Sequence, residues 1–260
     1  MPDGRLEITR GQGPLVATAI HAGHEIREEL AGCMAISSAD RLREEDPLTD
    51  RFTEAAPTRV IASHSRFEVD LNRPREAAVY MTPQDSWGLR VWQTQPDPAA
   101  VERSLAGHDR AYAALHQLYS ELAAQHGKLV VLDIHSYNHR RGGPDVPPAD
   151  SLTHPQVNVG TGTMDRERWA PVVDRFIQDM HAYDFPGGRL DVRENVIFKG
   201  GYHARWTHES FPRSACVLAV EFKKFFMDEW TGKADADLLD AITDALRSTM
   251  SGLLEELAGL

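Results

Sequence analysis

The segment Lys128 to Tyr137, KLVVLDIHSY, constrains the fold more than any other stretch of the chain. Five of the six residues from Leu129 to Ile134 are apolar, and Gly127 precedes the segment. Short continuous apolar runs are typical of strands buried on both faces, as in parallel sheets. The segment therefore predicts a central strand with His135 just past its carboxyl end, where open α/β sheets bind ligands. The alternative is a structural histidine held by its neighbours.

Two further apolar runs end in residues that can do chemistry. The run from Pro14 to Ile20 is followed by the sequence HAGHE, which places His21 and His24 three residues apart. The run from Ala215 to Phe222 carries Glu221 near its end. If Glu221 faces a site, partial burial raises its pKa toward that of a working base, whereas a position beyond the sheet leaves it in solvent.

The composition predicts one globular domain over residues 1–260. Hydrophobic content of 42% and charged content of 26% are ordinary for such a domain. The net charge of −11 argues against nucleic acid and anionic membrane surfaces as partners, but it leaves room for a small anionic substrate beside a local cluster of basic residues. With no apolar run of membrane-spanning length and no signal-peptide pattern, we expect a cytoplasmic protein. Cys33 and Cys216 are expected to be free thiols.

Histidines and acids suggest a metal ion. The chain has 12 histidines, and two histidines at the spacing of His21 and His24 can turn toward one ion. An acidic run that contains Glu45 and Asp46 follows. Such a run is usually a solvated helix face, but one of its carboxylates could also supply a metal ligand.

Basic residues form a candidate anion clamp. Arg66, Arg73 and Arg75 lie within ten residues, near two expected strands, Arg59–Ala62 and Phe67–Asp70. A guanidinium pairs with a carboxylate through two hydrogen bonds, although surface salt bridges are the competing interpretation. Long loops rich in Gly and Pro are often functional, and one such loop follows His135.

Helical periodicity is clearest in two places. Apolar residues recur every three or four positions from Ala99 to Gln125 and again from Leu239 to Leu257. Both patterns predict helices that pack one face against the sheet.

Several motifs together resemble the N-formylglutamate amidohydrolase family, which is similar in fold to zinc carboxypeptidases and aspartoacylases. They are HAGH, SRFEVDLNRP, LDIHSY, KGGYHARW and VEFKKFFMDEW, and they are spread over about residues 15 to 230. The resemblance implies a three-layer α/β/α sandwich with a mixed central sheet, zinc-carboxypeptidase-like (phosphorylase/hydrolase-like), with one Zn²⁺ ion at the strand carboxyl ends.

The resemblance also implies roles for individual residues. His21 and His135 match metal ligands, and Glu221 matches the general base. Arg66 is a plausible polariser of the substrate carbonyl. The expected substrate-binding residues are Asn72, Arg73, Arg140, Lys199 and Tyr202.

The remaining metal ligand is left open. Carboxypeptidases have a Glu three residues after the first His, and this chain has His24 there. His24 could replace that Glu, or Glu25, Glu45 or Asp46 could reach the ion instead.

The implied function is zinc-dependent hydrolysis of an N-acyl acidic amino acid such as N-formylglutamate, with release of formate, in amino-acid catabolism such as histidine degradation. One alternative is a carboxypeptidase-like peptidase or a deacylase for another acyl group. A second is a metal-binding or ligand-binding relative without catalysis.

Overall fold

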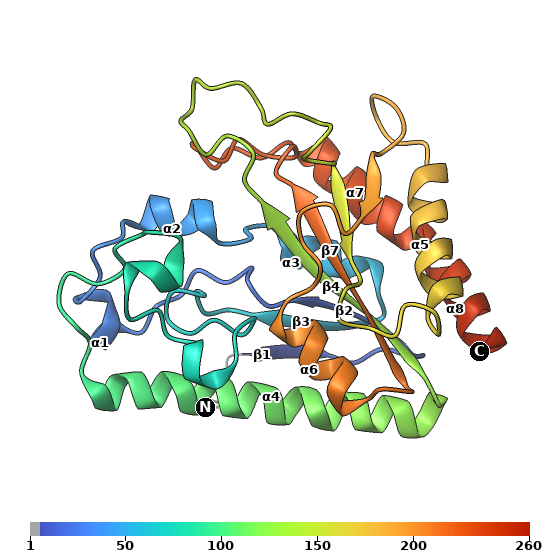
Figure 1. Ribbon diagram of the computed structural model, residues 1–260, viewed down its shortest axis with the longest axis horizontal. Helices are drawn as coiled ribbons and strands as arrows, with labels where there is room; N and C mark the ends of the chain where they lie inside the picture. Colours follow the sequence, from blue (N-terminus) through green and yellow to red (C-terminus); the bar gives the residue numbers. More distant parts are fainter. Residues whose placement is uncertain (1–5) are drawn as a thin grey trace.

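The computed structural model describes residues 6–260, in which seven strands form one mixed sheet (Figure 1). The strands are β1 (Leu6–Thr9), β2 (Leu15–Ala19), β3 (Thr58–Ala62), β4 (Leu129–Tyr137), β5 (Val157–Gly160), β6 (Val192–Glu194) and β7 (Ala215–Lys223). Their order across the sheet is β1-β3-β2-β4-β7-β5-β6. The central strands β3, β2, β4 and β7 are parallel, whereas β1 and β5 run antiparallel to their neighbours β3 and β7.

Helices cover both faces of this sheet. They are α1 (Glu28–Ala31), α2 (Ser38–Glu44), α3 (Thr49–Phe52), α4 (Pro98–His126), α5 (Ala170–Ala182), α6 (Tyr202–Ser210), α7 (Ala236–Ser248) and α8 (Met250–Gly259). Short 3₁₀ turns span Thr53–Ala55, Arg75–Ala77 and Pro83–Ser86. One face packs against α4 and α6, and the other against α3, α5, α7 and α8 (Figure 1). The predicted α/β fold with a mixed central sheet is confirmed.

Strand β4 shows why the sheet is covered on both sides. Successive strand residues point to opposite faces. Val130, Leu132 and Ile134 enter the core beneath α5 and α7, whereas Leu129 and Val131 enter the core beneath α4. An unbroken apolar run is the consequence of two buried faces.

The predicted helices are largely confirmed. Helix α4 ends at Gly127, whose φ of 78° is a left-handed conformation that suits glycine. The C-terminal segment forms two helices rather than one, because the helix is interrupted at Thr249, between α7 and α8. Cys33 and Cys216 are free thiols, as predicted.

The strand predicted over Phe67–Asp70 is wrong. This segment is a turn in which the main-chain N–H groups of Glu68 and Val69 donate back to the carbonyl oxygen of Ser65. The turn leaves the Asp70 side chain facing inward. Within residues 6–260, no helix combines the length and apolar character needed to cross a membrane.

Candidate active site

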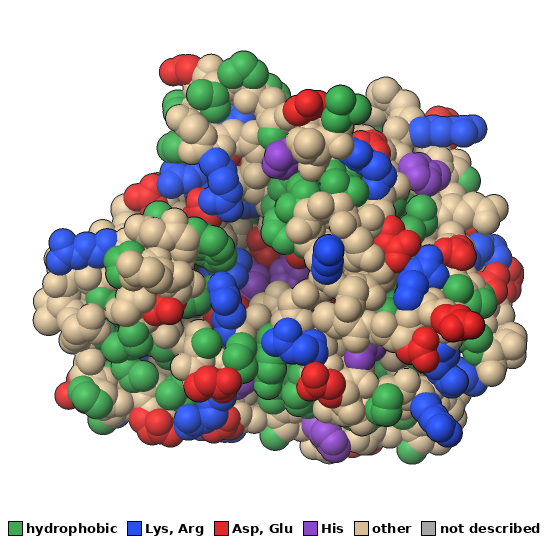
Figure 2. All heavy atoms as spheres, in the orientation of Figure 1, with side chains coloured by type: hydrophobic (Ala, Val, Ile, Leu, Met, Phe, Trp, Pro, Cys, Tyr) green, Lys and Arg blue, Asp and Glu red, His purple; other side chains and the backbone are tan. Residues whose placement is uncertain are grey.

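A cavity of about 580 Å³ opens at the carboxyl ends of the central parallel strands. Figure 2 shows a hollow where histidine and acidic atoms are visible between blue Lys and Arg side chains. Its charged and histidine lining residues are His21, Glu44, Asp46, Arg66, Arg73, His135, Arg141, Lys199, Arg205, Glu221 and Lys224.

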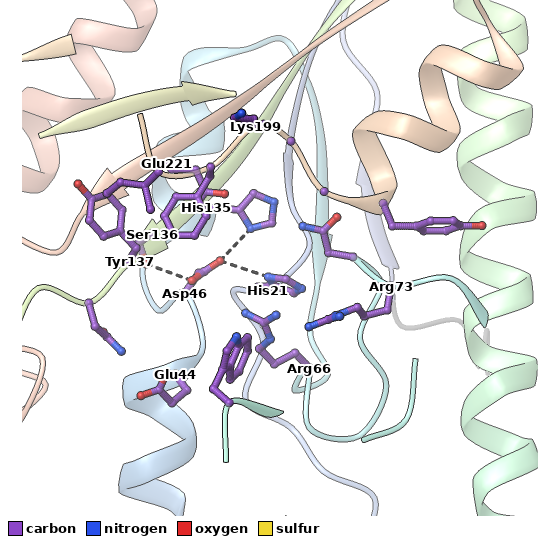
Figure 3. Close-up of a pocket in the computed structure, with 18 of the residues that line it drawn as sticks. His21, Glu44, Asp46, Arg66, Arg73, His135, Ser136, Tyr137, Lys199 and Glu221 are labelled. Carbon is purple, nitrogen blue, oxygen red and sulfur yellow. Dashed lines mark hydrogen bonds and ion pairs between the residues drawn. The ribbon is translucent and has the colours of Figure 1, made fainter. Parts of the chain in front are cut away.

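His21, Asp46 and His135 converge on one point at the floor of this cavity (Figure 3). All three are buried, and one ligand atom from each lies within 4.8 Å of the others. His135 Nδ1 is 2.9 Å from Asp46 Oδ2, and His21 Nδ1 is 3.4 Å from the same oxygen. Two imidazole nitrogens and one carboxylate are a donor set typical of catalytic zinc sites.

Each histidine of this cluster has a second buried carboxylate on its far side. His21 Nε2 lies 2.7 Å from Asp70 Oδ1, and His135 Nε2 lies 3.2 Å from Asp133 Oδ2. With a metal bound, a proton on each Nε2 would leave the Nδ1 lone pairs aimed at the shared point near Asp46. Such carboxylate-backed histidines are the usual supporting arrangement for metal ligands.

The electrostatics of the cluster favour a cation. Burial alone would raise the pKa of Asp46, but His135 and His21 hold it far below its usual range. Burial alone would lower the pKa of His135, but Asp133 and Asp46 hold it well above its ordinary value. His21 Nδ1 has no hydrogen-bond partner within residues 6–260. The residues present therefore fit a bound divalent metal.

Asp46 is fixed in place by contacts that need no metal. It follows α2, and its main-chain N–H donates to the carbonyl oxygen of His21 over 3.0 Å. The buried Lys224 Nζ donates to the carbonyl oxygens of Arg43 and Glu45, at 2.6 and 2.8 Å. Burial lowers the pKa of Lys224 to about 8. These bonds fix the main chain around Asp46, so that its carboxylate lies next to the two histidines.

Glu221 lies beside the cluster. It is paired in register with His135 on the neighbouring strand, and it lines the cavity (Figure 3). Burial raises its pKa to about 7, and the opposing charges of His135 and Arg66 only partly offset this rise. A carboxyl with such a pKa can accept and return a proton near neutral pH.

Arg66 is held between an acid and an aromatic ring. Its Nη2 donates to Asp70 Oδ2 over 2.8 Å, and its guanidinium carbon lies 4.8 Å from the centre of the Trp87 ring. This contact fixes the guanidinium at the cavity wall.

Asn72 and the Gly-Gly segment lie in close contact. The side-chain oxygen of Asn72 accepts a hydrogen bond from the main-chain N–H of His203 over 3.1 Å. A Cβ added to Gly201 would lie 2.2 Å from that oxygen. Glycine is therefore required at position 201 if Asn72 is to keep its place.

The structure brings most of the predicted site residues together. Those that line the one cavity are His21, Arg66, Asn72, Arg73, His135, Lys199, Tyr202 and Glu221. Asp46, one of the four alternatives for the remaining metal ligand, joins them.

His24, Glu45 and Arg140 are not among the residues that line this cavity. His24 Nδ1 pairs with Glu45 Oε2, and its Nε2 contacts the Ser38 hydroxyl. Arg140 donates its main-chain N–H to Glu229 and lines a separate pocket. Glu25, another alternative, lies in a bridge to His64 rather than in the cluster.

Arg205, Lys224 and Trp87 also line the cavity, although the sequence analysis predicted no site role for them. Arg205 follows Tyr202 by three residues, which is one helical turn in α6, so the KGGY motif was the available signal. Lys224 lies within the VEFKKFFMDEW motif, which was the available signal for it. Trp87 carried no such signal, because its approach depends on a long-range contact with Arg66.

The model of the family described as N-formylglutamate amidohydrolase matches residues 13–227. The chain belongs to the N-formylglutamate amidohydrolase family. Membership indicates a hydrolase that acts on amide bonds. No curated protein matches the sequence at a significant level.

Solved structures agree with this fold. The crystal structure of N-formylglutamate amidohydrolase from Ralstonia eutropha JMP134 is similar with a TM-score of 0.74 and 17% identity, over 99% of this chain and 100% of that one. A gene product from Agrobacterium tumefaciens is similar with a TM-score of 0.63 and 18% identity, over 97% and 96% of the two chains. At such identities the likeness concerns the fold.

Proposed function

We propose that this protein is a zinc-dependent hydrolase of N-acyl acidic amino acids, with N-formylglutamate as the first substrate to test. The observation that carries the proposal is the His21–Asp46–His135 cluster, which lies beside Glu221 in a cavity rich in basic residues. Family membership supports hydrolysis of an amide bond. A cytoplasmic location and a role in amino-acid catabolism stay predictions.

His21, Asp46 and His135 would hold the metal. A divalent ion in such a set polarises a carbonyl and makes water more acidic. Glu221 accepts the proton that the attacking water loses and passes it to the leaving nitrogen, as the C–O bond forms and the C–N bond breaks. Arg66 faces the same space and stabilises negative charge that develops on the carbonyl oxygen.

The cavity suits a small anionic substrate. Its volume of about 580 Å³ lies within the usual range for small-molecule sites. Arg66 and Arg141 are already paired with Asp70 and Glu44, at 2.8 and 3.0 Å. Arg73 makes no ion pair with a carboxylate within residues 6–260, so its guanidinium can bind a substrate carboxylate beside Asn72.

Substitution of Glu221 by Gln tests the proposal. The zinc-loaded Glu221→Gln protein should keep its metal and release formate from N-formylglutamate at a rate 10² to 10⁴ times lower than wild type, because the proton acceptor is gone. Formate release and elemental zinc content are measured together.

The matched control is Glu194→Gln, a half-buried glutamate of β6 outside the cavity, and this variant should retain wild-type turnover. A folded, fully active Glu221→Gln protein contradicts the assigned role. Wild-type zinc without formate release contradicts the substrate and leaves other acyl groups to be assayed.

A further inference from the structure

We propose that His203, which lies outside the cavity, is a positioning residue that holds the metal ligand His135 in place through Asp133. The inference rests on the proposed function only in taking His135 as a metal ligand. His203 is on α6, directly after Tyr202, and its side chain is completely buried.

Asp133 lies between the two histidines. One of its oxygens, Oδ2, is 3.2 Å from His135 Nε2, and the other, Oδ1, is 3.0 Å from His203 Nδ1. Both are close contacts of ion-pair type rather than aligned hydrogen bonds. The Thr18 hydroxyl donates to Oδ1 over 2.7 Å. Asp133 is fully buried, so its charge depends on these contacts. His203 therefore helps to set the position of the carboxylate that faces His135.

The far side of His203 is held as well. Tyr119 of α4 lies with its hydroxyl 3.0 Å from His203 Nε2. If the hydroxyl donates to Nε2, the ring proton is on Nδ1 and faces Asp133. Tyr119, His203, Asp133 and His135 thus form a series of buried polar side chains. The series joins helix α4 to the His21–Asp46–His135 cluster.

The main chain of His203 reaches the substrate side of the same cavity. Its N–H donates to the side-chain oxygen of Asn72 over 3.1 Å. One residue thus contacts the supports of both halves of the site, through its ring toward His135 and through its backbone toward Asn72. A residue that served only the hydrophobic core beneath α6 would need neither contact.

The experiment measures metal affinity rather than turnover. Zinc binding is titrated in competition with a chelator, and the visible absorption of the Co²⁺-loaded protein reports the ligand geometry. His203→Leu should weaken zinc binding by about 10-fold and alter the Co²⁺ spectrum, because loss of a direct outer partner of a metal ligand costs about 10- to 100-fold and His203 acts one contact further out, through Asp133. His203→Asn should restore much of the affinity, since its amide nitrogen is placed near the position of Nδ1.

His208→Leu is the matched control. His208 is also a buried histidine of α6, but it contacts Thr163 and the main-chain N–H of Val217 instead of Asp133. This variant should lose stability without a change in zinc affinity. If His203→Leu does not fold, Tyr119→Phe replaces it and should weaken zinc binding by a few-fold.

Wild-type zinc affinity in His203→Leu, or in Tyr119→Phe where that variant replaces it, overturns the positioning role. A wild-type protein that binds no zinc overturns the metal site itself, and the proposed function with it. Failure to hydrolyse N-formylglutamate, with the expected order of zinc affinities, overturns only the substrate assignment.

Discussion

Two histidine–carboxylate groups, one with His21 and Asp46 and one with His24 and Glu45, come from neighbouring positions in the chain. They differ in burial and in the hydrogen bonds of their histidines. His21, with Asp46 and His135, is buried at the cavity floor, and one of its ring nitrogens has no hydrogen-bond partner within residues 6–260. His24 is partly exposed, and both of its ring nitrogens contact Glu45 or Ser38.

The difference shows what separates the proposed metal site from a structural histidine–carboxylate pair. Both groups contain the right kinds of atom, and the HAGH spacing does not separate them. In the His21 group the Nδ1 atom of His21 faces Asp46 without a hydrogen-bond partner, and an acid lies behind each ring. In the other group both nitrogens of His24 are engaged, and Glu45 also contacts Ser65 and Arg41. An available donor atom, rather than residue type, marks the site.

The largest expected effect is a difference in zinc affinity between variants of Asp46 and Glu45. Asp46→Asn should weaken zinc binding by more than 100-fold, because changes outside the ligand set alone have effects of 10- to 100-fold. Glu45→Gln, one residue earlier, should bind zinc as wild type does. Competition titration of both proteins is the measurement, and equal loss of zinc in both would break the comparison.

The second effect is a loss of folding stability, and it is expected in the variant that keeps its zinc. Glu45→Gln should lower the free energy of unfolding by about 2 kcal/mol, since the new amide group meets donors in a fully buried place. Urea unfolding of the metal-free protein measures it. A neutral result would mean that Glu45 is not the structural acid that its contacts indicate.

The smallest effect belongs to His24. His24→Ala should cost about 1 kcal/mol of stability, because its side chain is 37% exposed and Glu45 keeps other partners. Zinc affinity should stay at the wild-type value. A loss of zinc affinity in this variant would mean that His24 is a zinc ligand.

Much of the site could be predicted from the sequence because it lies at strand ends. The apolar runs before His21 and His135, and the run that carries Glu221, identified three adjacent strands, so parallel packing alone brings these residues together. The fold class followed from the same runs and from the family motifs.

The remaining ligand could not be predicted in this way. Asp46 reaches the cluster through bonds to His21 and through the hold of Lys224 on its neighbours, and these contacts join residues far apart in sequence. The false strand at Phe67–Asp70 has a related cause. Its alternating apolar residues fit a strand, but the turn is stabilised by Ser65 and by the pairing of Asp70 with Arg66 and His21.

The fixed position of Asp46 has a consequence for metal exchange. Since the Asp46 main-chain N–H donates to the His21 carbonyl oxygen and Lys224 donates to the carbonyl oxygen of Glu45, the segment that carries Asp46 is held without an ion, and the metal-free and metal-loaded proteins should share one fold. Removal of the ion then requires no unfolding, so chelation and reloading should be reversible. The cellular metal supply, rather than the folding pathway, would decide which ion the protein carries.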